Sequence, residues 1–178
     1  MLSSGAVLLL FFVGAGYALS DAMFFRQLVS RNGIATPDDA WEFLGSHIRP
    51  ARPGTPTPRL SISARYMLTQ QKELHCDAGA LLMATILREI GYRSRLVDLH
   101  GHDGISHHTV LEVEENGHWY VYDTLLRQRR TTLKDAARGY GFELARPVRR
   151  PSWSTYRSIV YNNAFLKFFI FKLRGIPG

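Results

Sequence analysis

The sequence contains a single cysteine, Cys76, among its 178 residues. One cysteine cannot form an internal disulfide, so the chain is not a disulfide-stapled scaffold. The sequence also has no internal repeat, no low-complexity array, no acidic cluster typical of calcium sites and no recognisable nucleic-acid motif. Its length and a hydrophobic content of 46% predict one domain with its own core.

Acidic residues are in the minority. Lys and Arg number 22 against 15 Asp and Glu, which gives a net charge of +7 and a pI near 9.9. Such a chain is attracted to anionic partners, such as lipid headgroups, acidic polysaccharide or nucleic acid. Since no motif supports nucleic acid, we expect no such partner and favour a membrane-facing surface.

Charge is absent from residues 2–19. As a helix this stretch spans about 27 Å, just short of a hydrocarbon core. Ala18-Leu19-Ser20 offers the small residues of a signal-peptidase site, and cleavage there would export the domain. However, no basic residue precedes the stretch, whereas Arg26 and Arg31 follow it, which favours an uncleaved anchor with the domain in the cytoplasm. Residues 1–20 are thus predicted to be a hydrophobic signal or anchor segment, with a buried amino-terminal helix as a third alternative.

The next segments carry helix signals. Asp21–Val29 predicts a helix that ends near Asn32-Gly33, and Thr36 followed by Pro37 predicts the start of another, which ends at Arg49-Pro50. Four prolines between positions 49 and 59 predict an extended loop, and residues 61–71 a short helix.

A β-hairpin is predicted around Asn116-Gly117, because this dipeptide between two alternating runs is a strong two-residue turn signal. The turn pairs 115 with 118, 113 with 120 and 110 with 123. His108 and Asp123 then share a face as diagonal neighbours, close enough for a side-chain hydrogen bond. His107 points to the other face, so the register selects His108 as the partner of Asp123.

Cys76 stands at the start of a predicted helix. Apolar side chains recur at helical spacing from Ala78 to Ile90, and Gly91 occupies a left-handed C-cap position. A helix N-terminus favours a thiolate, and an imidazolium from His108 would favour it further. A lone cysteine is more often a buried, inert side chain, but the His108–Asp123 hairpin downstream predicts a nucleophile, base and orienting carboxylate.

The order of these motifs resembles the transglutaminase-like superfamily of papain-type thiol enzymes over about residues 36–125. The shared pattern is a cysteine that opens a helix, then G-x-x-x-R-x-V, H-x-x-V-E-V and W-x-x-x-D. The residues that carry it are Cys76 with Ala80, Gly91 with Arg95 and Val97, His108 with Glu112 and Val113, and Trp119 with Asp123.

The resemblance implies an α+β fold with a papain-like core, in which the nucleophile helix packs on an antiparallel sheet. It implies a Cys76–His108–Asp123 triad that acts on a peptide or protein amide through a thioester, with hydrolysis preferred over amine transfer. Gln70 lies six residues before Cys76, the offset of the oxyanion-stabilising glutamine in papain-type enzymes. This chemistry requires no cofactor and no metal.

Two alternatives remain open at this stage. Four of the seven histidines fall within positions 100–108, so His100, His102 and His107 could hold zinc together with Cys76 or His75. The second alternative is a membrane-attached binding or scaffolding domain that has kept the fold without catalysis. The intact Cys–His–Asp set argues against it, because a binding module does not need all three.

The sequence divides into three predicted parts. Residues 1–20 form the signal or anchor segment, 21–145 the thiol-enzyme domain and 146–178 a basic and aromatic tail. Aromatics interleaved with cations over residues 164–174 suit an interfacial helix on anionic lipid, or equally one that packs on the domain.

Overall fold

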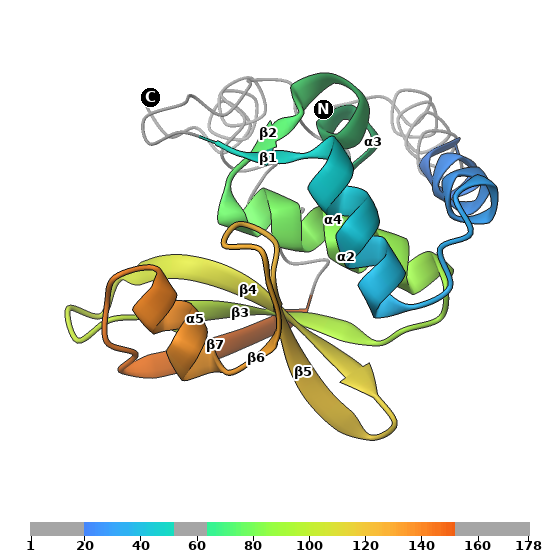
Figure 1. Ribbon diagram of the computed structural model, residues 1–178. Coiled ribbons are helices and arrows are strands. Elements are labelled where there is room, and N and C mark those ends of the chain that lie inside the picture. Colours follow the sequence, from blue (N-terminus) through green and yellow to red (C-terminus); the bar gives the residue numbers. More distant parts are fainter. Residues whose placement is uncertain (1–19, 52–63, 152–178) are drawn as a thin grey trace, which may run out of the picture.

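A computed structural model describes residues 20–51 and 64–151 of the chain. They form an α+β fold in which helices cover a five-stranded antiparallel sheet of strand order β6-β5-β4-β3-β7 (Figure 1). The α+β class and the helix that packs on an antiparallel sheet are therefore confirmed.

The sheet is built on the predicted hairpin. Its strands are β3 (Ser94–His100), β4 (Ser106–Glu115), β5 (His118–Asp123), β6 (Gln128–Thr131) and β7 (Arg146–Pro151). Glu115 pairs with His118 and Val113 with Tyr120, as the turn register predicts. Asn116 and Gly117 both have positive φ, 52° and 80°, which is the conformation of a type I′ turn.

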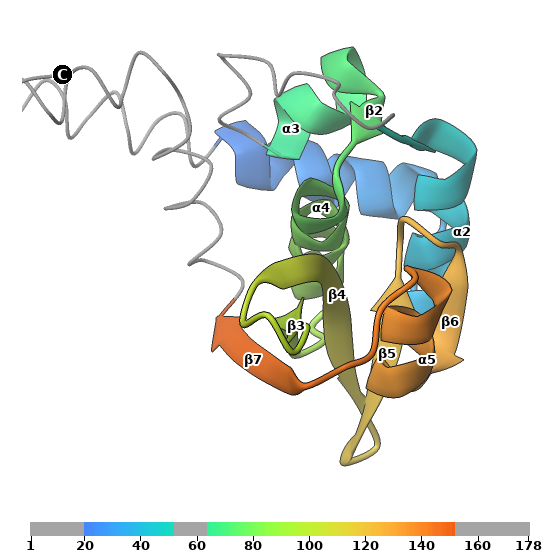
Figure 2. The same cartoon turned by 90° about the vertical axis from the view of Figure 1, so that its left-hand side faces the viewer.

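Helix α4 (Cys76–Glu89) lies across one face of the sheet, and Figure 2 shows it nearly end-on above β3 and β4. Residues 79–87 are all buried, because the helix packs between the sheet and the amino-terminal helices. Gly91, with φ of 83°, ends it, and the Tyr92 amide donates to the Leu87 carbonyl. The predicted helix and its glycine cap are confirmed.

A smaller helix, α5 (Leu133–Gly139), covers the opposite face of the sheet. Its Ala136 and Ala137 pack against the side chains of the sheet that face away from α4. The sheet therefore separates two hydrophobic clusters. The side chains of the smaller one are Val97, Leu99, Val110, Val121, Ala136 and Ala137.

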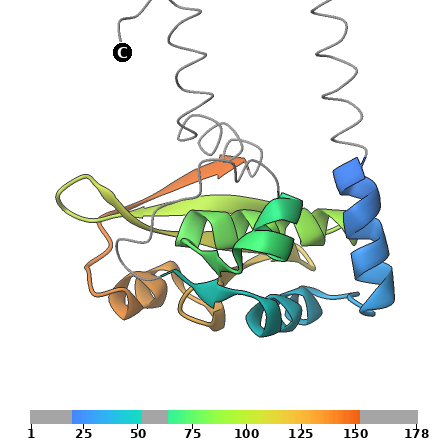
Figure 3. The same ribbon diagram turned by 90° about the horizontal axis from the view of Figure 1, so that it is seen from above.

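The amino-terminal residues form a helical layer over α4. Residues 20–31 are helical and cross one end of α4, where Arg26 pairs with Glu89 (Figure 3). Helix α2 (Pro37–His47) starts with the predicted cap, in which Thr36 and Asp39 form a reciprocal capping box. The remaining elements are β1 (Arg49–Pro50), α3 (Ala64–Tyr66), the π-helix η1 (Met67–Gln71) and β2 (Glu73–Leu74), which pairs in parallel with β1.

The boundary predicted at residue 146 needs correction, because residues 146–151 belong to the sheet as strand β7. Two ion pairs attach this strand. Arg149 binds Glu112 through two hydrogen bonds of 2.9 and 3.1 Å, and Arg150 binds Asp98 at 2.6 and 2.9 Å. The sequence indicates only a basic tail here, because Glu112 and Asp98, the partners of Arg149 and Arg150, lie far away in the sequence.

The hydrophobic segment predicted at residues 1–20 and the tail helix at 164–174 lie outside the described residues, apart from Ser20. Within residues 20–51 and 64–151, no helix is long and apolar enough to cross a bilayer.

The buried Glu112 provides a test of how β7 is attached. Glu112 is 4% exposed and also accepts from Arg95 at 2.6 Å. Burial by itself raises the pKa of Glu112, but hydrogen bonds from Arg149 and Arg95 bring it below its usual 4.5. A lowered pKa gives stability that is present above the unfolded-state value and is lost as the pH falls through the folded-state value.

We therefore expect Glu112→Gln to lower the free energy of unfolding at pH 7 by about 2 kcal/mol, and by much less at pH 3. Urea unfolding at both pH values measures this. Glu143→Gln, at a side chain that is 86% exposed, is the control. Equal losses for Glu112→Gln at both pH values would show that its charge does not hold β7.

Candidate functional site

A buried hydrogen bond joins β4 to the end of β5. His108 Nε2 lies 2.6 Å from Asp123 Oδ2, and neither side chain is exposed to solvent. The two residues lie across the hairpin, in the diagonal relation that the Asn116-Gly117 turn predicts. The structure thus brings together His108 and Asp123, and not His107, as the register required.

The tight turn after β5 fixes the Asp123 carboxylate. Its Oδ1 accepts hydrogen bonds from the backbone amides of Leu125 and Leu126, both at 2.9 Å. Both carboxylate oxygens are therefore occupied, one by the turn and one by His108. These two amides were not identified from the sequence, although an aspartate that caps the turn following it is a familiar local motif.

Cys76 is the first residue of α4 and is half-buried. The helix start packs tightly on the segment after Asp123, because a Cβ at Gly79 would come within 2.6 Å of Thr124 Oγ1. Glycine at position 79 therefore lets the first turn of α4 approach the end of β5. This contact places the thiol beside the His108–Asp123 pair.

His108 is electrostatically coupled to both of its neighbours. Burial by itself lowers the pKa of His108, but the hydrogen bond to Asp123 and the interactions with Cys76 and Asp123 raise it from 6.5 to about 9. Its Nε2 is used by Asp123, and its Nδ1 is buried without a hydrogen-bond partner among the described residues. Nδ1 is thus the ring atom left for the Cys76 thiol, and the ring is an imidazolium at neutral pH.

Tyr140, which the sequence did not indicate, covers the imidazole. The two rings are stacked with centroids 4.4 Å apart and an interplanar angle of 8°. Tyr140 follows α5 and is 43% exposed, whereas His108 is 1% exposed. The ring therefore shields His108 from water. The stacking depends on how α5 packs on the sheet, and no sequence pattern near position 140 predicts this contact.

The predicted oxyanion donor, Gln70, is exposed on the π-helix η1. Its neighbour Gln71 is half-buried, with Oε1 out of contact with solvent and without a hydrogen-bond partner in the described part of the chain. The role of Gln70 stays a prediction.

The histidines of the 100–107 loop have separate partners. His100 Nδ1 lies 2.9 Å from the Gly104 carbonyl oxygen, His107 Nε2 lies 2.7 Å from Asp103, and His102 Nε2 lies 3.8 Å from Glu143. Residues 20–51 and 64–151 contain no group of three or more His, Cys, Asp or Glu side chains that could hold a metal ion. The zinc alternative therefore has no support in the described residues.

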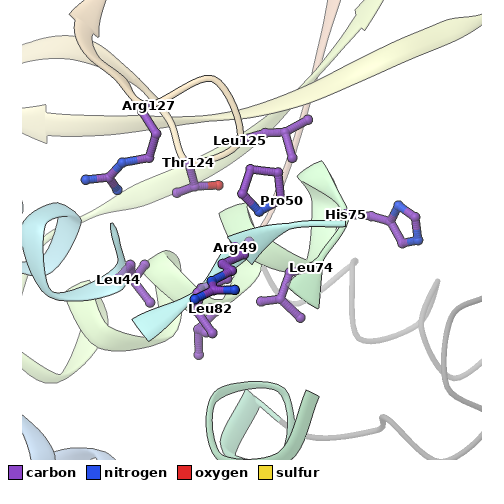
Figure 4. Close-up of a pocket in the computed structure, with 11 residues that line it drawn as sticks. Leu44, Arg49, Pro50, Leu74, His75, Leu82, Thr124, Leu125 and Arg127 are labelled. Atoms are coloured by element: carbon purple, nitrogen blue, oxygen red, sulfur yellow. The ribbon is translucent and has the colours of Figure 1, made fainter. Parts of the chain in front are cut away.

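A cavity of about 20 Å³ adjoins the start of α4 (Figure 4). It lies between α2, the β1–β2 pair, α4 and the loop after β5. Its lining residues are Leu44, Ile48, Arg49, Pro50, Leu74, His75, Gly79, Leu82, Thr124, Leu125 and Arg127.

The coupling between His108 and Asp123 can be measured directly. We expect Asp123→Asn to lower the pKa of His108 from about 9, because burial is then opposed only by the interactions with Cys76. The His108 imidazole signal followed by NMR against pH gives the value. Asp103→Asn, which alters the partner of His107, is the matched control and leaves His108 unchanged. A midpoint that stays near 9 in Asp123→Asn would refute the coupling.

In comparisons with known proteins, no family model matches the chain, and no curated protein matches it significantly. The functional assignment therefore rests on the geometry of this site and on the residue pattern that leads to it.

Proposed function

We propose that the protein is a cysteine enzyme of transglutaminase-like, papain-type fold that cleaves an amide. The observation that carries the proposal is the buried His108–Asp123 pair, with its remaining ring nitrogen left for the cysteine that opens α4. The chain order also supports it, since a nucleophile helix comes first and two antiparallel strands then supply the histidine and the aspartate.

In the first step the Cys76 thiolate attacks the carbonyl carbon of the amide and forms a tetrahedral intermediate. The backbone amide of Cys76, at the positive end of α4, stabilises the oxyanion, and Gln70 is the proposed side-chain donor. The intermediate collapses to a thioester when the carbon–nitrogen bond breaks.

His108 supplies the proton in that step. Its imidazolium keeps Cys76 ionised and then protonates the departing amine, which leaves a neutral imidazole. Asp123 holds the ring in the orientation that directs Nδ1 at the reacting atoms, as the third member of a triad does. Because the Leu125 and Leu126 amides fix Asp123, the orientation is set by the backbone of the turn.

The acceptor decides the class of enzyme. With water, the neutral His108 removes a proton, the thioester is hydrolysed, and the products are a carboxylic acid and the free thiol. With an amine, the same steps transfer the acyl group. We prefer hydrolysis of a peptide or protein amide, by an enzyme held at a membrane surface through residues 1–20.

Alkylation of Cys76 against pH tests the proposal. We expect iodoacetamide to react rapidly with the full-length chain well below pH 8.5, where an ordinary thiol is largely protonated. His108→Ala should lose this reactivity, because the imidazolium that stabilises the thiolate is gone. The control is His107→Ala, since His107 lies next in the chain but pairs with Asp103. Mass spectrometry of the labelled Cys76 peptide gives the rate.

An ordinary thiol titration in the wild type would end the enzyme proposal, and so would a Cys76 that never reacts. The cysteine would then be structural, and a non-catalytic binding domain would be the better account.

The pH–rate profile of amide cleavage should also fall on the alkaline side. His108 is the proposed acid, so we expect kcat/KM for a peptide amide to fall as the pH rises through about 9, where the imidazolium loses its proton. A rate that stays level to pH 10.5 would exclude His108 as the proton donor. In Asp123→Asn this fall should move to lower pH.

A further inference from the structure

The cavity at the start of α4 adjoins the proposed nucleophile. His75 and Gly79, which line it, stand immediately before Cys76 and three residues after it. Residues three or four apart are neighbours on a helix surface, so the thiol lies next to the wall that Gly79 contributes. Thr124, on the opposite wall, directly follows Asp123. Cys76 and Asp123 do not themselves line the cavity, but their chain neighbours His75 and Thr124 do, so a group that occupies it lies next to the start of α4 and the end of β5.

Two arginines and no carboxylate line the cavity. In Figure 4 Arg49 extends from β1 and Arg127 from the loop after β5, with the Arg127 guanidinium directed away from Pro50 and Leu125, and the His75 ring points away from the other labelled side chains. None of the cavity's lining residues is an Asp or Glu. Two cations that share a small cavity without a counter-ion create a positive potential there.

Arg127 is held in place without a carboxylate. Its guanidinium lies 3.7 Å from the centroid of the Trp41 ring and donates to the Trp41 carbonyl oxygen at 3.1 Å. A methyl group at Gly45 would collide with the guanidinium, which would have to shift to make room. Four N–H donors remain beyond the one bound to Trp41. The turn that fixes Asp123 also leads directly to Arg127, which ties this cation to the triad.

Arg49 is exposed and makes no ion pair with the described residues. Its strand neighbour Glu73 forms no ion pair with it either. Of the other nearby acids, Glu42 binds Arg129 at 3.0 Å and Asp77 accepts from the Ala78 amide at 2.8 Å. Glu42 also attracts Arg127 and offsets part of its charge, but neither Arg49 nor Arg127 forms an ion pair with a carboxylate among the described residues.

We propose that this cavity is a subsite for a carboxylate, so that the enzyme selects amide substrates with an anionic group close to the scissile carbonyl. The inference rests on the proposed function, because it assigns the substrate class of the same site. Arg49 and Arg127 bind the carboxylate oxygens, and Thr124 can donate its hydroxyl. The small volume suits a carboxylate that displaces water, and not a large apolar side chain.

Two alkylating reagents of equal reach and different charge test the subsite. Iodoacetate transfers a carboxymethyl group and iodoacetamide a carbamidomethyl group to the Cys76 thiolate, each with release of iodide, so that only iodoacetate carries a carboxylate. The measured quantity is the ratio of their rates on the full-length chain, relative to the same ratio on glutathione. We expect the protein to raise this ratio about tenfold, as an anion a few ångströms from a guanidinium near the surface should.

Variants locate the effect. Arg49→Gln and Arg49→Glu should each lower the ratio, with the charge reversal giving the larger drop, and Arg49→Lys should retain most of it. Arg127→Gln should lower it too. Arg31→Gln is the matched control, because it removes one exposed positive charge from the helical residues 20–31 and leaves the ratio unchanged.

The outcomes separate the two proposals. Fast iodoacetamide labelling with a ratio equal to that of glutathione overturns the subsite and leaves the thiol enzyme standing. Absence of fast labelling by either reagent overturns the proposed function itself. A raised ratio that survives Arg49→Glu and Arg127→Gln assigns the preference to the His108 imidazolium or to the overall charge of +7, and it also overturns the subsite.

Protection experiments identify where the carboxylate comes from. One short acetylated peptide is prepared with a free carboxyl terminus, with an amidated terminus, and amidated with an internal Gln→Glu change. Slower iodoacetamide labelling with the first peptide assigns the subsite to a terminal carboxylate, and with the third to an acidic side chain. If neither the free-carboxyl peptide nor the Gln→Glu peptide protects Cys76 better than the amidated neutral peptide, the carboxylate subsite is wrong.

Discussion

The hydrogen bond between His108 and Asp123 is the constraint on which the rest of the site depends. Two ionisable side chains without solvent contact are costly to bury, and the cost is offset only if each finds good partners. Asp123 receives two backbone amides and the imidazole, and His108 receives Asp123, Cys76 and the ring of Tyr140. The pair thus draws the end of β5, the start of α4 and the end of α5 to one place.

Close packing at two glycines transmits this arrangement to the neighbouring elements. Gly79 lets the first turn of α4 contact Thr124, so the position of the Cys76 thiol depends on the position of the end of β5. Gly45 leaves room on α2 for the guanidinium of Arg127, and Arg127 belongs to the same turn after β5. One turn of backbone after β5 therefore positions both the carboxylate of the proposed triad and the guanidinium of Arg127.

Some features could be predicted because each depends on residues close in sequence or on one two-residue turn. These are the hairpin, the start and cap of α4, the capping box of α2 and the choice of His108 over His107. Tyr140, Arg127 and strand β7 could not be predicted, because their contacts are tertiary. Arg149 finds Glu112 and Arg150 finds Asp98 across the sheet, and the sequence alone shows them only as charges near prolines. The fold over α4 and the triad geometry follow from local rules, and the surroundings of the triad do not.

The ion pairs show which of the cations behind the net charge of +7 lie close to a carboxylate and which do not. Arg95 and Arg149 share Glu112, Arg150 binds Asp98, and Arg130 binds Glu115, so three carboxylates offset most of the charge of these four cations. Arg49 is left without such a partner in the described residues, and it stands at the cavity beside Cys76. In the proposed enzyme this positive charge lies next to the proposed nucleophile, Cys76, where we expect it to act on the substrate rather than on the stability of the fold.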